Sequence, residues 1–346
     1  RDGALALLGL QAQSAEKDDV RRALERWRAV DFEDAAAERG LVVSALRTFA
    51  QWDAHPQSQA IATQPLFSIT RIGDAPPLAL PALTAQQRPL DGVRLLDLTR
   101  IIAGPIGGRT LAAYGAEVML VNSPRLPNID SIMESSRGKL SVQLDLHNPG
   151  ERQTLDALVR DSHVFLQGYR PGGLAAMGFS PERLAHLRPG IVAVSLCAYG
   201  SMGPWADRRG FDSLVQTATG FNDAEGRAFG SAEPRVLPVQ ILDFATGFLI
   251  AYATAVALWR QQTQGGTWHV ELSLAQTGHW LRSLGRVPNG PQAIAPDRQP
   301  FIESSRCGYG DLVALRHSAQ LGRTPAHCGR PSMPPGSHAP QWPTRV

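Results

Sequence analysis

Short apolar runs alternate with longer amphipathic stretches through the middle of the chain, from Val93 onwards. The apolar runs predict five strands, at 93–98, 117–121, 140–144, 163–167 and 191–196. The stretches between them predict helices near 106–115, 150–160 and 181–187. Strand–helix alternation is typical of a parallel sheet covered by helices. We therefore expect an α/β fold with a doubly wound, mainly parallel, Rossmann-like sheet.

The flanking segments have different patterns. Residues 15–40 are charged and helical, and they are followed by a possible strand at 41–46, a helix at 46–62 and a strand at 65–73. A long apolar helix ends at Gly265–Gly266 and leads through a strand into a smaller domain or extension. These patterns predict four parts: a helical and αβ segment at 1–80, a proline-rich linker at 81–90, a core at 91–285 and an irregular, proline-rich tail at 286–346.

The charge and cysteine content exclude several classes. The formal charge of 346 residues is only +3 and its basic residues are scattered, so we expect no nucleic-acid partner. Three distant cysteines predict neither a metal site nor a disulfide framework, and they favour a reducing cytoplasm. No apolar run of about 18 residues is evident, so we expect neither a membrane span nor a signal peptide. Because Arg1 lies within a helical pattern, we expect the natural sequence to have further residues before it.

Residues 95–121 predict a strand, a tight turn, a helix and a second strand, which is half of a nucleotide-binding fold. The turn has no Gly-x-Gly-x-x-Gly and no Walker lysine, and Asn122 occupies the place of the ribose-binding carboxylate. A nicotinamide-dependent dehydrogenase is therefore disfavoured, although the strand pattern alone would allow it.

Several motifs follow one another in a specific order: "LDGVRLLDLTRIIAGP", "LAAYGAEV", "LSVQLDLHNPGERQTLDALVRDSHVFLQGYRPGGLAAMGFSPERL", "GFDSLVQTATG" and "LPVQILDFATGFLIAYATAVAL". Over roughly residues 89–275 they resemble the class III CoA-transferases, the family of formyl-CoA transferase, carnitine CoA-transferase and α-methylacyl-CoA racemase. The resemblance implies that the sheet binds coenzyme A and that the protein is a homodimer, in the family interlocked like two rings. Residues 15–75 resemble the family's C-terminal portion, which here precedes the core.

Asp243 lies where the apolar run of "QILDFATG" enters a helix. Aspartate is a common helix N-cap, so capping alone would explain it. The resemblance implies instead that Asp243 is the nucleophile. Asp212 in "GFDSL" is a second acid, either a cap or a helper near the site. The racemase branch has a histidine at the position of Phe211, and phenylalanine cannot transfer a proton, so racemase chemistry is disfavoured.

The resemblance also implies a set of CoA contacts: Ala103, Gly104, Leu144, Tyr169, Met177 and Arg209. Arg170 and Lys139 are further candidates for the phosphates, because a polyanionic ligand needs fixed cations. Four polar positions of the family are changed, to Ile102, Ser123, Gly168 and Ala176. Each lost charged hydrogen bond removes about 1.5–3 kcal/mol of binding, so we expect weak CoA binding.

The leading hypothesis is a CoA-transferase acting between an acyl-CoA and a carboxylic acid, through an aspartyl anhydride and an aspartyl-CoA thioester. Backbone N–H groups of Thr246, Gly247 or the "AGP" turn are candidates for stabilising the oxyanions. The alternative is a degenerate family member that binds without turnover. A CoA-ester racemase is less favoured, and no metal is expected.

Overall fold

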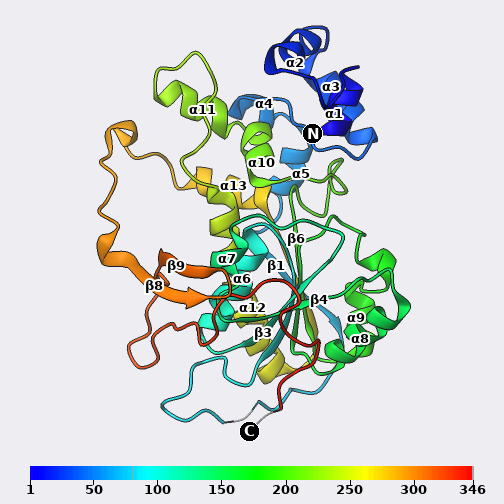
Figure 1. The fold of residues 1–346 in the computed structure, drawn as a ribbon, viewed down its shortest axis with the longest axis vertical. Coiled ribbons are helices and arrows are strands. Elements are labelled where there is room, and N and C mark those ends of the chain that lie inside the picture. Colours follow the sequence, from blue (N-terminus) through cyan, green and yellow to red (C-terminus); the bar gives the residue numbers. More distant parts are fainter. Residues whose placement is uncertain (81, 345–346) are drawn as a thin grey trace. The chain divides into compact units, whose positions relative to one another are not determined.

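The computed structural model describes residues 1–80 and 82–344 (Figure 1). Its main sheet has seven strands in the order β1-β7-β6-β5-β2-β3-β4. Their bounds are β1 Ser68–Gly73, β2 Arg94–Leu98, β3 Glu117–Asn122, β4 Lys139–Gln143, β5 Val164–Gln167, β6 Val192–Cys197 and β7 Thr267–Ser273. The pairs β2–β3, β2–β5, β3–β4 and β5–β6 are parallel, whereas β1 is antiparallel to β7. The mainly parallel, doubly wound sheet is confirmed, and each core strand lies within one residue of its predicted bounds.

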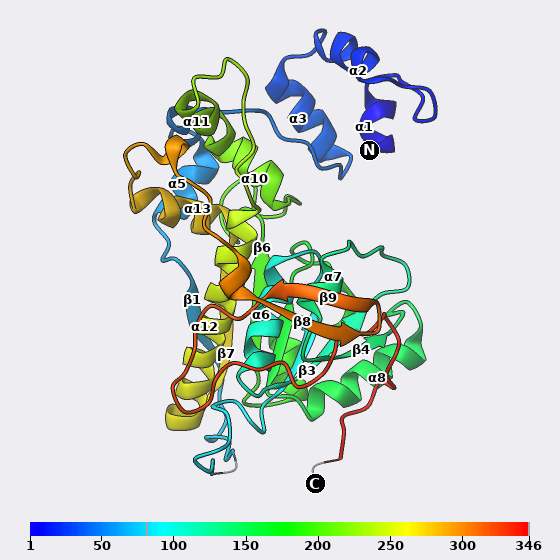
Figure 2. The ribbon, with the colours of Figure 1, turned by 60° about the vertical axis from the view of Figure 1, so that its left-hand side comes forward.

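Helices cover both faces of this sheet (Figure 2). They are α6 Ala103–Ala113, α8 Pro149–Arg160, α9 Pro181–Leu187 and α12 Ile241–Gln264, and the short helix α7 Ile132–Ser135 contacts α6. Side chains of α6 and α12 share one buried cluster with the strands, and side chains of α8 and α9 share the other. Because both faces are buried, the parallel strands are almost uniformly apolar, which made them easy to recognise.

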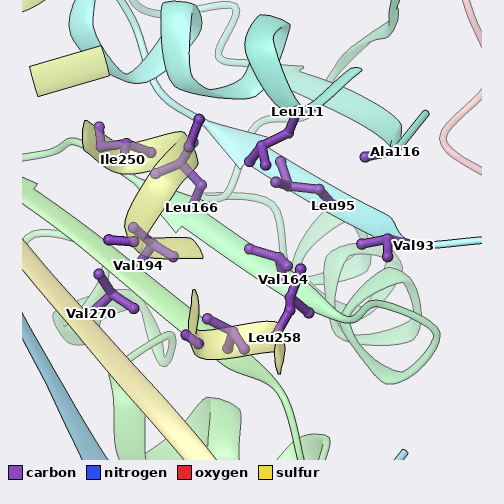
Figure 3. Close-up of a cluster of buried hydrophobic side chains, with 14 of the residues drawn as sticks. Val93, Leu95, Leu111, Ala116, Val164, Leu166, Val194, Ile250, Leu258 and Val270 are labelled. Carbon is purple, nitrogen blue, oxygen red and sulfur yellow. The ribbon is translucent and has the colours of Figure 1, made fainter. Parts of the chain in front are cut away.

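Figure 3 shows the first cluster, in which strand side chains meet Leu111 of α6 and Ile250 and Leu258 of α12. Leu95 and Val164 are fully buried here. Burial of each such side chain stabilises the fold by about 1.5–3 kcal/mol. The cluster therefore fixes α6 and α12 on one face of the sheet, and both helices begin near the candidate site.

The expectation that no segment is long and apolar enough to span a membrane needs correction. Helix α12 has 24 residues and is apolar enough by length and composition, with 56% of its most apolar window buried inside the protein. The core helix of a folded protein has the same properties, so this feature is weak evidence for a membrane span.

The segment before the sheet is more broken than expected. It contains α1 Asp2–Leu7, α2 Lys17–Leu24, α3 Ala29–Glu38, α4 Phe49–Asp53 and α5 Pro56–Ala62. The helix predicted at 46–62 is interrupted at His55, since the residue before a proline is driven to extended geometry and here has a ψ of 136°. The helix predicted at 15–40 is interrupted at Arg28, which is also extended.

No strand forms at 41–46 in this described segment. The backbone there is bonded to a side chain instead of a neighbouring strand, because the N–H of Ala45 donates to Glu33 Oε1 at 2.9 Å. The carboxylate of Glu33 is itself held by Arg47, at 2.9 Å from Nη1.

Contacts divide the chain into two compact units. The first comprises residues 1–66, 197–242 and 273–293, with α10 Asp212–Thr219, α11 Phe221–Ala228 and α13 Leu274–Ser283 besides the N-terminal helices. The second comprises residues 67–196, 243–272 and 294–346, and it contains the sheet. The boundaries proposed from sequence at 80, 90 and 285 stay a prediction.

The tail was expected to be irregular, but part of it is a hairpin. Strands β8 Ile302–Cys307 and β9 Gly310–Leu315 pair antiparallel around Gly308–Tyr309. Short 3-10 helices occur at Ala175–Met177, Gly290–Gln292 and Gln299–Phe301.

The rest of the tail is extended and follows β4. The N–H of His338 donates to the carbonyl of Ser141 at 2.9 Å, and the N–H of Ser141 donates to His338 Nδ1 at 2.9 Å. Trp342 Nε1 donates to the carbonyl of Leu158 at 3.1 Å. The tail is therefore bonded to the sheet, although it is irregular in outline.

Candidate active site at the carboxyl end of the sheet

The strand order reverses between β2 and β5, because the chain first adds β3 and β4 on one side of β2 and then returns to its other side. In such sheets ligands bind outside the carboxyl ends of the strands at this point. The loops after the two strands touch: a methyl group on Gly168 would lie 3.6 Å from Thr99 Cγ2. Ile101 has a φ of 74°, which is unusual for a β-branched residue. The predicted "AGP" turn and Tyr169 therefore meet at the expected ligand crevice.

A buried ion pair lies beneath this crevice. Lys139 Nζ is 2.7 Å from Asp97 Oδ2, and both side chains are 0% exposed. The same ammonium donates to the carbonyl of Pro105 at 2.8 Å. Burial lowers the pKa of Lys139, and the carboxylate of Asp97 acts in the opposite direction. The pair thus ties the ends of β2 and β4 to the first turn of α6. The prediction that Lys139 binds CoA phosphates was wrong, because its ammonium group is buried and paired with Asp97.

Helices α6 and α12 approach closely through glycines. A methyl group on Gly247 would lie 2.7 Å from Ile106 Cβ and 2.8 Å from the carbonyl oxygen of Ala103. One on Gly107 would lie 2.6 Å from Ile250 Cγ2. Real Cβ atoms do not approach other atoms so closely, so this contact requires residues without side chains. Residues later in α6 contact residues later in α12, so the two helices run in the same direction here.

Asp243 is the third residue of α12 and is 7% exposed. It precedes Gly247 by one turn, so both residues lie on the helix face towards α6. Since the helices run in the same direction, Asp243 lies level with the loop that leads from β2 into α6. The structure thus brings Asp243 to the same end of the sheet as Ala103 and Gly104.

Two predictions about this helix end were wrong in detail. Asp243 lies inside the first turn and is not the N-cap, although a carboxylate there still benefits from the helix dipole. Thr246 and Gly247 lie in the second turn, where backbone N–H groups donate to carbonyls four residues earlier. Their N–H groups are therefore poor candidates for binding an oxyanion.

The start of α6 offers better donors. Helix geometry leaves the N–H groups of Ala103 and Gly104 without an intrahelical acceptor. Pro105 has no N–H, and the N–H of Ile106 is already bonded to the carbonyl of Ile102 at 2.9 Å. Two adjacent amides at the start of α6 are thus left for an acceptor outside the helix.

The apolar CoA candidates border one cluster. Leu144 is buried within the cluster of the α8–α9 face, and Tyr169 and Met177 pack against it while half-buried. Burial raises the pKa of the Tyr169 hydroxyl, and the nearby Arg100 opposes this shift. Arg100 was missed by the sequence-based reasoning, although a cation directly after a central strand is a signal for an anion site.

Arg209 and Asp212 belong to the other compact unit. Arg209 is exposed, with Nη1 3.5 Å from the carbonyl of Gly40. Asp212 is the first residue of α10 rather than its cap, which is Phe211, and its buried carboxylate accepts from Gln216 Nε2. The structure therefore gathers Asp243 and the other CoA candidates in one unit, with Arg209 in the second.

Within residues 1–80 and 82–344, no three His, Cys, Asp or Glu side chains are grouped so as to hold a metal. Cys197, Cys307 and Cys328 are not joined in disulfides.

Comparisons with known proteins show the family of this chain. The family model described as CoA-transferase family III matches residues 90–285. An acyl-CoA transferase of Gibberella moniliformis is 32% identical over 78% of this chain and 51% of its own length. A formyl-CoA:oxalate CoA-transferase of Rhodopseudomonas palustris is 30% identical over 58% of this chain and 51% of its own length.

A crystal structure of Rv3272 from M. tuberculosis superposes with a TM-score of 0.61 at 20% identity, covering 73% of this chain and 98% of the other, and so supports the fold. The chain spans about half the length of the curated relatives it matches.

Proposed function

Because the chain belongs to CoA-transferase family III, we propose that it transfers coenzyme A from an acyl-CoA thioester to a carboxylic acid. The observation that supports this most is the position of Asp243. It is a nearly buried carboxylate at the start of α12, level with the loop that enters α6. Formyl-CoA and oxalate occur in the name of one relative, so small carboxylic acids are the first candidates as acceptors.

The proposed reaction has two halves. The carboxylate of Asp243 attacks the thioester carbonyl and expels CoA thiolate, which leaves an acyl-aspartyl anhydride. The thiolate then attacks the aspartyl carbonyl and releases the donor acid, which leaves an aspartyl-CoA thioester. The acceptor carboxylate attacks this thioester and expels the thiolate again. Attack of the thiolate on the acceptor's carbonyl gives the new acyl-CoA and restores Asp243.

Each attack places negative charge on a carbonyl oxygen. The N–H groups of Ala103 and Gly104 are the donors we propose for it, because they are fixed by the helix and need no rearrangement. For CoA itself we propose contacts from Leu144, Tyr169 and Met177, with Arg100 as an added cation for a phosphate. Arg209 stays a prediction from the sequence.

The test is intact mass measurement after incubation with a panel of acyl-CoAs, followed by peptide mapping. We expect a covalent adduct on the peptide that carries Asp243 and transfer of CoA to an added acid. The control is Asp243→Asn, which keeps the side-chain shape but has no nucleophilic carboxylate. It should abolish adduct and transfer at an unchanged melting temperature.

Transfer retained by Asp243→Asn would remove Asp243 from the mechanism. CoA binding without adduct or turnover across the panel would favour the second candidate, a binding protein without catalysis. The changed polar positions Ile102, Ser123, Gly168 and Ala176 are the specific observation behind that candidate.

We also propose a cytoplasmic homodimer, from three cysteines that form no disulfide with one another and from the family resemblance. Light scattering on the purified chain tests the dimer, and fractionation of cells tests the location. A monomer at micromolar concentration would contradict the first part.

A further inference from the structure

A second site candidate lies away from Asp243, between the β8–β9 hairpin, the C-terminal half of α6 and the segment 316–331. It is a groove of about 980 Å³, all within the unit that contains the sheet. We name it the arginine groove, after the six arginines among its lining residues: Arg109, Arg137, Arg298, Arg306, Arg316 and Arg330. Only two carboxylates, Asp297 and Glu303, line it with them. The lining therefore has an excess of four positive charges, whereas the whole chain has +3.

Two of these arginines form a fixed floor. Arg109 is 9% exposed and Arg137 is 6% exposed. Both contact the carboxylate of Glu134, and Arg137 Nη1 is 2.6 Å from Glu303 Oε1. Guanidinium groups immobilised in this way lose little freedom when a ligand binds.

The floor retains an unused hydrogen-bond donor on a charged group. Burial and the neighbouring Arg137 lower the pKa of Arg109 to about 10, so it is still charged at neutral pH. Its Nε is buried and has no hydrogen-bond partner. A buried donor without an acceptor is unfavourable, and an anion at the floor would relieve it.

The rim supplies cations that are not neutralised. Among residues 1–80 and 82–344, neither Arg298 nor Arg316 has a carboxylate within ion-pair distance. The guanidinium group of Arg316 donates to the carbonyl of Pro300. Arg306 is 3.9 Å from Asp311, and both side chains are largely exposed. The hydroxyl groups of Ser304 and Ser305 line the groove beside them.

We propose that the arginine groove binds a small polyanion, a molecule with two or more phosphate or carboxylate groups. Guanidinium groups bind both kinds of anion by paired N–H bonds, and several arginines around one groove can engage several such groups at once. The groove is separate from the proposed catalytic carboxylate, because Asp243 faces the start of α6 whereas Arg109 lies further along that helix. The ring of His317, which lines the groove, is 5.8 Å from Phe248 of α12, so the ligand would lie beside the helix that carries Asp243.

Titration calorimetry at low ionic strength tests the proposal, with inorganic tripolyphosphate and citrate as the two probes. We expect saturable binding of at least one probe at one site per chain, weakened by added salt. The pair of probes separates phosphate from carboxylate as the preferred group. The variant with both Arg298→Gln and Arg316→Gln should bind at least about tenfold more weakly, because two charged contacts are lost from exposed positions that do not hold the fold together.

The matched control is Arg160→Gln, the same charge change at an exposed position of α8 in the same unit. It should bind like the unaltered protein, and so should Asp243→Asn, which keeps the test independent of the proposed transfer. Cys328 lines the groove and gives a local readout, since a bound polyanion should slow its alkylation as measured by mass spectrometry. Absence of saturable binding of both probes, equal weakening by Arg160→Gln, or unchanged alkylation of Cys328 at saturation would each overturn the assignment.

Discussion

Replacing Lys139 by methionine should be among the most damaging single changes in the sheet. Methionine fills similar space but removes the ammonium that binds Asp97 at 2.7 Å and the carbonyl of Pro105 at 2.8 Å. The carboxylate of Asp97 would remain fully buried, with the neutral N–H and hydroxyl of Thr99 as partners. Leaving one member of a buried ion pair uncompensated costs about 3–5 kcal/mol.

The loss is measurable by hydrogen exchange across a urea series, read on the peptides that contain β2 and β4. With an m value of about 3 kcal/mol per molar, the midpoint for these strands should fall by roughly 1–1.7 M. The double change Asp97→Asn with Lys139→Met should recover part of this loss, because it removes the isolated charge. A shift of Lys139→Met below about 0.3 M, or a double variant less stable than the single one, would refute the reasoning.

Two further changes follow from the same geometry. Gly247→Ala would place a methyl group 2.7 Å from Ile106 Cβ, so it should lower the free energy of unfolding by about 1–3 kcal/mol. It should also reduce CoA transfer, because it moves Asp243 away from α6. Calorimetric melting and transfer assays measure the two effects, and unchanged values for both would contradict the close contact. Burial is the main reason why the pKa of His317 is below its ordinary value, and therefore the unfolded chain binds more protons between the two pKa values. The free energy of local unfolding near the hairpin should be highest above about pH 6.5 and should fall as the pH drops below that value. Amide exchange of residues 302–331, corrected for intrinsic rates, should show this pH dependence. The dependence should disappear in His317→Gln.

The sheet was predictable because its strands are buried on both faces, so each reads as a nearly continuous apolar run. The start of α6 was placed three residues late. Gly104 and Pro105 are poor helix formers inside a helix, but proline is well tolerated in the first turn. The N-terminal helices were merged for a related reason: Pro56 allows a new helix to begin, but it also ends the preceding one at His55.

The candidate site was only partly predictable. The motif around Asp243 identified the right carboxylate for study, but its burial and its face towards α6 depend on packing between helices that are more than 100 residues apart in sequence. The partner of Lys139 was not visible either, because Asp97 lies 42 residues earlier in β2, which is not adjacent to β4 in the sheet. The β8–β9 hairpin was not predictable in this way, because neither IESSRC nor GDLVAL alternates between apolar and polar residues.

The tail that follows β4 affects whether the chain aggregates. β4 is the last strand of the main sheet, and its outer edge would otherwise present bare N–H and C=O groups. The bonds between Ser141 and His338 occupy that edge with a segment too irregular to recruit another strand. Proteolytic nicking in the tail would therefore do more than shorten the chain. It would convert a closed edge into a template for intermolecular β-pairing, so clipped material should precipitate under conditions in which the intact chain stays dispersed.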